Sequence, residues 1–314
     1  MSLDADTLAD RRRLKRRLFF WRAGAIAAVA AAVIVLLAEG GVVLPGAQIA
    51  RVSITGVVVD DRPQQEMLEQ LAEDDNVKAV ILSIDSPAGT TTGAEALFTS
   101  IRKVSEKKPV VAVLGTVAAS GGYIAALSAD HIVARGNTIT GSIGVLFQWT
   151  QIEELLDNIG VEMKEIKSAP LKAEPNPFHK TSPEAIRVTQ AMLDTSYEWF
   201  LRLVAERRNM DATKAKELGD GRVYTGWQAV ENGLIDELGG EEQAIAWLAS
   251  EHGIHEELPV RDWTPAYPEL GMAGFAGRVL GEAAVTAIGG LGGKTQQAKR
   301  LTLDGLTSVW QPDL

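Results

Sequence analysis

The chain of 314 residues contains no cysteine and only four histidines. Without cysteine it can form no disulfide and can use no thiol nucleophile. None of the histidines lies in a motif typical of a catalytic triad, and His252 and His255 lack the further ligands of a metal site, so no metal or other cofactor is expected. If the chain has a catalytic nucleophile, the simplest remaining choice is a serine activated by a lysine amine.

The formal net charge of −10 is unevenly distributed along the chain. Residues 1–22 carry seven basic side chains against three aspartates, a surplus of four positive charges that leaves the remainder near −14. A domain with this excess of negative charge is not typical of a nucleic-acid binder, so no nucleic-acid partner is expected.

Directly after the basic segment, the sequence from Ala23 to Ala38 has no charged residue. Together with Leu18–Trp21, and interrupted only by Arg22, it gives about twenty residues, enough for a helix that spans a bilayer. The arginines place the N-terminus in the cytoplasm. We therefore expect a cytoplasmic tail at 1–22, a single membrane anchor at 23–40 and the remaining chain on the outer side of a bacterial inner membrane. A cleaved signal peptide is the alternative, because it also combines a basic start with an apolar middle.

Apolar strands alternate with helical segments over residues 47–257, which predicts an α/β domain with repeated β-α units and a parallel sheet. The expected strands are 49–59, 79–84, 110–114, 131–134 and 144–147. The expected helices are 64–73, 93–105, 122–129, 182–208, 211–218, 227–232 and 241–252. Residues 258–314, in which 270–291 are rich in glycine and alanine, are expected to form an amphipathic helix and a flexible tail.

Ser120 is the candidate nucleophile because it follows an apolar strand and precedes two glycines, in the segment Ala118-Ala119-Ser120-Gly121-Gly122. Glycines permit the sharp turn that exposes a nucleophile, and the amide of Gly121 can then stabilise an oxyanion. The alternative is a serine that only caps the following helix. The loop Ser86–Thr90 ends a neighbouring strand, so both segments should meet at the carboxyl edge of the sheet, where Gly89 can supply a second amide.

Lys172 is the candidate general base, and Lys167 is its rival in the same segment. A lysine base must be largely uncharged, which requires its pKa to be lowered by burial. Glu174 would oppose this if it came close. Ser142, in the segment Thr140–Val145, has a hydroxyl that could hold the lysine amine in place.

These segments, in their order, resemble the short bacterial form of signal peptide peptidase A. The motifs that carry the resemblance are Ser86–Gly89, Ala118–Gly122, Thr140–Val145, Lys167–Lys172 and Gly221–Gly226, and they extend over roughly residues 48–250. The sequence departs from the family at Ala88 and Ala169, where glycine is usual. A positive φ at Ala88 would strain the site.

The resemblance implies a ClpP/crotonase-like fold and a membrane-anchored serine endopeptidase that degrades hydrophobic peptides such as cleaved signal peptides. It implies Ser120 as nucleophile, Lys172 as base, Ser142 as the residue that orients the lysine, and the amides of Gly89 and Gly121 as oxyanion hole. It also implies a homo-oligomeric ring in which neighbouring subunits share each site. The alternatives are a related protease that trims a stomatin-type membrane partner, a non-catalytic scaffold of the same fold, and acyl-CoA chemistry.

Overall fold

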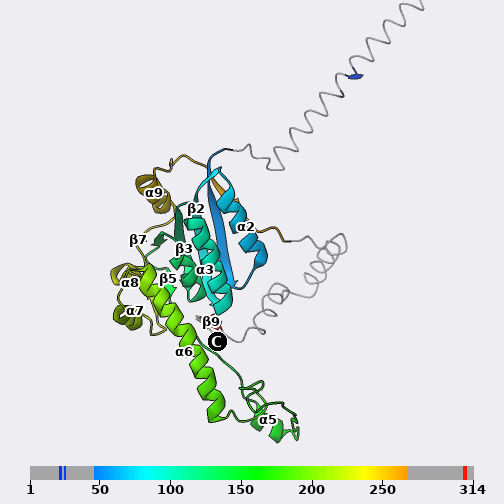
Figure 1. Cartoon of the computed structure of the whole chain (residues 1–314). Coiled ribbons are helices and arrows are strands. Elements are labelled where there is room, and N and C mark those ends of the chain that lie inside the picture. The colour runs from blue at the N-terminus through cyan, green and yellow to red at the C-terminus, as the bar shows by residue number, and fades with distance from the viewer. Residues whose placement is uncertain (1–20, 23–24, 26–45, 268–306, 310–314) are drawn as a thin grey trace, which may run out of the picture. The chain divides into compact units, whose positions relative to one another are not determined.

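The computed structural model describes residues 21–22, 25, 46–267 and 307–309 of the chain (Figure 1). The chain divides into two compact units, Met1–Gly46 and Ala47–Leu314, and every element from β1 to β9 belongs to the second. Among the described residues, no helix has the length and hydropathy needed to cross a membrane. The expected anchor at 23–40 lies outside the described residues apart from position 25.

The second unit alternates strands with helices along the chain. Its strands are β1 (Gln48–Val58), β2 (Val77–Thr90), β3 (Val110–Ala119), β4 (His131–Ala134), β5 (Ile139–Gly141), β6 (Val223–Thr225), β7 (Glu237–Leu238), β8 (Val260–Trp263) and β9 (Thr307–Val309). Its helices are α2 (Arg62–Glu73), α3 (Thr91–Ser105), α4 (Gly121–Leu127), α5 (Glu153–Asn158), α6 (Pro183–Arg207), α7 (Ala212–Leu218), α8 (Gly226–Asn232) and α9 (Glu241–His252).

The strands form one sheet with the order β6-β5-β3-β2-β1-β8, and β4 adds beside β3 and β7. The pairs among β1, β2, β3, β4, β5, β7 and β8 are parallel, whereas β6 pairs antiparallel with β5 and β9 pairs antiparallel with β2. The predicted α/β class with a mostly parallel sheet is therefore confirmed. Neighbouring parallel strands must be joined by long crossover connections, and the helices that alternate with the strands in the sequence supply them.

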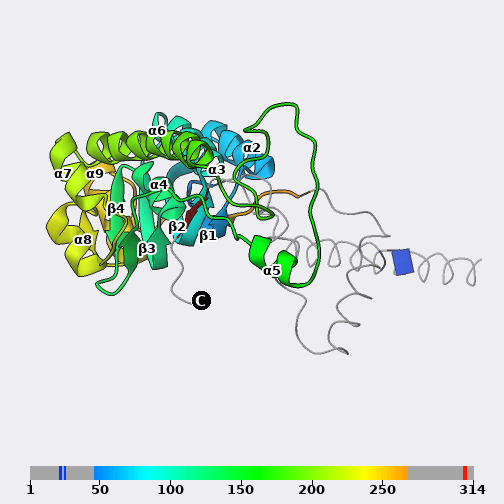
Figure 2. The same ribbon diagram turned by 90° about the horizontal axis from the view of Figure 1, so that it is seen from below.

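The sheet is covered on both faces because its central strands are apolar on both sides. On β2, Val80, Leu82 and Ile84 pack with the buried residues of α2, α3, α4 and α6, whereas Ala79 and Ile81 pack with α9. Figure 2 shows α2, α3 and α6 lying along the same side of the strands. The core thus holds the apolar parts of β2 and β3, the two strands that carry the candidate site, from both faces.

Two predicted strand ends were wrong, and both lie at the site. β2 continues to Thr90 and β3 to Ala119, whereas the sequence indicated strands that end at positions 84 and 114. The polar and glycine-rich residues looked like loops, but Ala88 and Gly89 pair with Val57 and Val58 of β1 beyond a shift in register. Neighbouring strands, which a local pattern does not contain, supply these hydrogen bonds.

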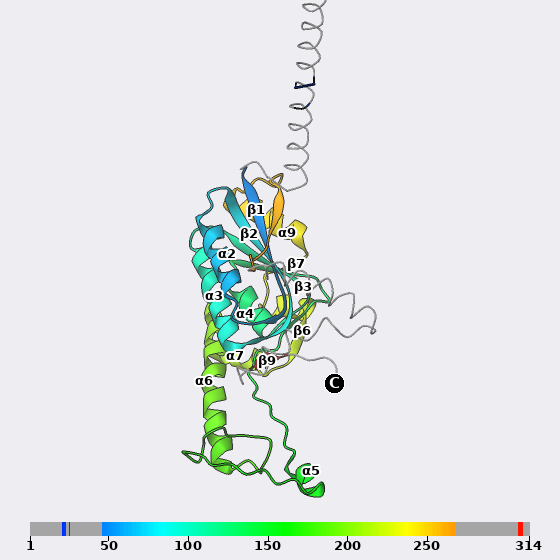
Figure 3. The same cartoon turned by 90° about the vertical axis from the view of Figure 1, so that its right-hand side faces the viewer.

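Helix α6 connects the sheet to an excursion of the chain, residues 144–182, that we call the arm. Ser182 caps α6, because its side chain accepts a hydrogen bond from the Ala185 amide, and Pro183 occupies the first turn. The predicted strand at 144–147 is wrong, because the strand forms earlier, at Ile139–Gly141. Figure 3 shows α5 and its flanking loops beyond the end of the sheet, near the start of α6.

Candidate active site

Ser120 lies at the junction between β3 and α4 in a strained backbone conformation. Its φ of 57° and ψ of −114° put a residue with a Cβ in a region that L-residues rarely adopt, at a cost of about 1–3 kcal/mol. The side chain is fully buried, and its Oγ has no hydrogen-bond partner among the described residues. Since the hydroxyl makes no capping bond, the alternative of a simple helix cap is wrong. A strained serine at a strand-to-helix turn is typical of a nucleophile.

Two glycines allow the end of β2 to touch the start of α4. A Cβ placed on Gly121 would lie 2.6 Å from the nitrogen and Cα of Gly89, and a Cβ on Gly89 would lie 3.1 Å from the Gly121 Cα. A Cβ on Gly122 would meet the Ser86 carbonyl oxygen at 2.4 Å. The absence of side chains therefore brings the backbones at positions 89 and 121 into direct contact beside Ser120. Backbone N–H groups that lie this close together can both donate hydrogen bonds to an oxyanion.

We expect Gly121→Ala to lower the free energy of unfolding by roughly 3 kcal/mol, because its Cβ would meet backbone that cannot move aside. The measurement is chemical denaturation of the variant. Gly144→Ala is the matched control, since its Cβ would come no closer than 3.7 Å to its nearest neighbour, and it should change stability by less than about 0.5 kcal/mol. Equal stability of both variants would contradict the close approach.

Ser142 lies beside the nucleophile. The pairing of Ala119 with Gly141 and the hydrogen bond from the Ser120 amide to the Gly141 carbonyl (2.8 Å) place it on the neighbouring chain segment. Ser142 is buried, has a φ of 49°, and its amide donates to the Arg222 carbonyl at 2.9 Å. The segment Gly221–Gly226 thus has a structural role, because its strand β6 supports the backbone next to Ser142.

The two alanines that replace family glycines create no strain. Neither Ala88 nor Ala169 is among the described residues with positive φ, so a side chain fits at both positions without backbone cost. Ala88 is fully buried, and the Ser86 hydroxyl donates to its carbonyl at 3.0 Å. The departure at Ala88 therefore leaves Gly89 free to keep its position.

The end of β2 also pairs with a strand from the far end of the chain. Ala88, Gly89 and Thr90 pair antiparallel with Val309, Ser308 and Thr307 of β9. An extended peptide backbone therefore fits on the edge formed by the residues beside Ser120. Strand addition of this kind is one of the recurring ways in which proteins bind peptides.

Lys172 lies in the arm and is not joined to Ser120 within this chain. Its side chain is exposed, and the Ser120 Oγ makes no hydrogen bond to it or to any other described residue. The arm exposes several large apolar side chains, namely Leu155, Ile159, Val161, Met163 and Ile166. The structure thus brings four of the five predicted site residues together at the sheet edge and leaves the lysine apart.

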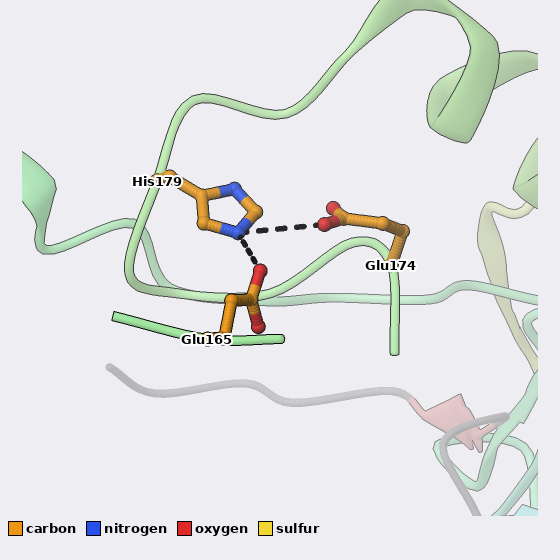
Figure 4. Close-up of side chains that lie close together, drawn as sticks. All are labelled: Glu165, Glu174 and His179. Carbon is orange, nitrogen blue, oxygen red and sulfur yellow. Dashed lines mark hydrogen bonds and ion pairs between the residues drawn. The ribbon is translucent and has the colours of Figure 1, made fainter. Parts of the chain in front are cut away.

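A cluster of charged side chains holds the arm together around Glu174, and the sequence did not indicate it (Figure 4). The Lys167 ammonium bonds the carboxylates of Glu165 (2.7 Å) and Glu174, and the His179 Nε2 lies 2.6 Å from the Glu165 Oε1 and 3.5 Å from the Glu174 Oε1. The Asn176 amide donates to the Glu174 Oε1 at 3.0 Å. The five residues are separated by up to fourteen positions in irregular backbone, so no periodic pattern marks them.

One ligand atom from each of Glu165, Glu174 and His179 lies within 4.8 Å of the others, a spacing that a cation could use. Here the Lys167 ammonium already bonds both carboxylates and supplies the positive charge. The hydrogen bond that its ammonium donates to Glu165, and then the one that it donates to Glu174, raise the pKa of Lys167, so Lys167 stays protonated. The group is therefore an ion-pair cluster, and Lys167 is poorly suited to be the rival base.

Comparison with known proteins gives matches over most of this domain. Residues 102–255 match the model of peptidase family S49. The chain is 40% identical over 209 residues to slr0021 of Synechocystis sp., a candidate protease, and the match covers 66% of this chain and 75% of the relative. It is 34% identical over 248 residues to a candidate signal peptide peptidase SppA of Enterococcus faecium, which covers 74% of this chain and 70% of the relative.

Two further comparisons are partial. The chain is 32% identical to Protease 4 of Haemophilus influenzae over 69% of its own length, which corresponds to 37% of that longer protein. Among solved structures, a ClpP1 mutant from Listeria monocytogenes aligns with a TM-score of 0.42 and 16% identity, over 60% of this chain and 91% of the other.

Proposed function

Because the chain belongs to peptidase family S49, we propose that it is a serine endopeptidase that cleaves apolar peptides with Ser120 as nucleophile and Lys172 as general base. The single observation that carries the proposal is the strained, buried Ser120, whose hydroxyl lacks any described partner beside the contact of Gly89 with Gly121. A buried hydroxyl without a partner is costly, and such groups are retained where function requires them.

The chemistry follows from these positions. The neutral Lys172 amine takes the proton of the Ser120 hydroxyl as the oxygen attacks the peptide carbonyl. The amides of Gly89 and Gly121 stabilise the negative oxygen that forms, and Ser142 orients the amine. Lys172 then donates its proton to the departing amine, which leaves an acyl group on Ser120. Water, deprotonated by the same lysine, attacks the acyl carbon, releases the acid product and restores the serine.

We further propose that the lysine of each site comes from a neighbouring copy of the chain in a homo-oligomeric ring. Lys172 is exposed on the arm, whereas Ser120 is buried at the sheet edge and has no bond to it. Apolar side chains at Ile159, Met163 and Ile166 are exposed on the same arm, and burying them against another copy would stabilise the assembly. A head-to-tail contact that closes into a ring has the required geometry.

The substrate in this proposal is an extended apolar peptide, such as a cleaved signal peptide. An extended strand already pairs with Ala88–Thr90 in the form of β9, so a substrate backbone can align antiparallel beside the oxyanion amides. Residues 23–40 would anchor the chain in a bacterial inner membrane, with the peptidase domain on the outer side. Apolar peptides concentrate at that surface.

The test is hydrolysis of a quenched apolar peptide by the full-length chain in detergent, with a polar peptide of equal length as control. We expect turnover of the apolar peptide, and a lower KM after deletion of residues 307–314, because β9 pairs with the same edge. If neither the full-length chain nor the deletion variant hydrolyses either peptide, the proposed function is contradicted. Turnover with an unchanged KM after the deletion would contradict only the shared edge.

A further inference from the structure

The most deeply buried charges of the arm lie on either side of the candidate base. The Glu174 side chain is 7% exposed and that of Lys167 is 16% exposed, and they bond each other. Lysine and glutamate are almost never this buried unless paired. The Glu174 Oε1 also accepts from Asn176, while its Oε2 has no partner among the described residues. Without Lys167, the Glu174 carboxylate would keep only its contacts with His179 and Asn176, and without Glu174, Lys167 would keep only Glu165.

The pair closes the short segment that carries Lys172. Lys167 and Glu174 flank it on the two sides, so their ion pair ties the segment into a loop. Within this loop the Lys172 amide donates to the Ala169 carbonyl at 3.1 Å, and Ala173 has a φ of 60°. Lys172 itself is exposed.

The pair also keeps the Glu174 carboxylate bonded to a cation other than Lys172. A carboxylate that paired with the Lys172 ammonium would favour its protonated form and so remove the neutral amine that a general base needs. Lys167 neutralises Glu174 and Glu165, and as a nearby cation it also disfavours a second positive charge. The other charged groups around the segment are His179, which contacts both carboxylates, Lys180, and Glu184 in the first turn of α6.

Building on the proposed function, we propose that Lys167 is a positioning residue of the active site, which holds Glu174 so that the Lys172 segment is closed and Lys172 does not pair with that carboxylate. This gives the first lysine of the Lys167–Lys172 segment a role that differs from the base. It also explains why a glutamate is tolerated two positions from a lysine that must lose its proton.

The test is the pH dependence of kcat/KM in variants that change the charge of this pair in opposite directions. Lys167→Met leaves the carboxylates uncompensated, so the acid limb of the profile should move to higher pH by about one unit. Glu174→Gln removes one of the two carboxylates that Lys167 bonds and makes the cluster more positive, so the limb should move to lower pH. Lys167→Arg keeps the charge and should keep the wild-type limb, and so should the double variant Lys167→Met/Glu174→Gln, although with a lower kcat.

His179→Gln is the control for the histidine of the cluster, and it should retain the wild-type limb. If the pair had only a structural role, both single variants would have a lower kcat and an unchanged acid limb. That result would overturn the proposal. Shifts of the same sign in both would overturn it too. If Lys167→Met fails to fold, the shift of the acid limb to lower pH in Glu174→Gln still tests the proposal. Full activity of Lys172→Ala would instead contradict the proposed function itself.

Discussion

Replacing Ser120 by alanine is expected to reduce kcat/KM for an apolar peptide by roughly 10⁴- to 10⁶-fold, the loss typical of removing a nucleophile. The fold should remain intact, because the hydroxyl makes no hydrogen bond to any described residue. Removing a buried, unpartnered hydroxyl is neutral or slightly stabilising. The variant should therefore combine lost activity with an unchanged or raised Tm, measured by peptide hydrolysis and calorimetry.

Ser128→Ala is the matched control. Ser128 is also fully buried and ends the same helix, α4, but its hydroxyl donates to the Ala125 carbonyl. Its removal should cost about 1 kcal/mol of stability and leave activity near wild type. Wild-type activity in Ser120→Ala, or a loss of stability larger than that of the control, would show that Ser120 has a structural role.

Replacing Lys172 by alanine should have the second-largest effect, a loss of roughly 10³-fold or more, because the nucleophile then lacks its base. Lys172→Arg should not restore activity, since a guanidinium stays protonated and cannot accept the serine proton. The side chain is exposed, so neither change should lower the Tm by more than about 1 °C. Hydrolysis assays on both variants check this, and an active Lys172→Arg would exclude proton transfer to this side chain.

The fold was predictable where its signals are local. Central strands of a parallel sheet are short apolar runs, as in Val80–Ile84, and α6 begins with a capping serine and a proline. The strained turn at Ser120 was also indicated, because two glycines follow the serine at the end of a strand. These features depend on residues close to one another in sequence.

The remainder depends on partners that are distant in sequence. Ser86–Thr90 resembles a loop, but strands β1 and β9 supply hydrogen bonds that extend β2 to Thr90. The Lys167 cluster joins side chains across irregular backbone, where no period of 2.0 or 3.6 marks the partners. The contact between Lys172 and Ser120 stays a prediction, because the two are not joined within this chain and the proposed site takes its lysine from a second copy.

Mixing Ser120→Ala with Lys172→Ala most directly tests whether neighbouring copies share each site. The two inactive proteins are dissociated together in mild denaturant, reassembled at equal concentration, and assayed on the apolar peptide. In a ring, random assembly should give about one quarter of the sites an intact serine beside an intact lysine, and activity should return to about one quarter of wild type. Mixing wild type with the double variant Ser120→Ala/Lys172→Ala calibrates the exchange. Recovery of no activity in the mixed single variants, despite proven exchange, would contradict a site shared between copies.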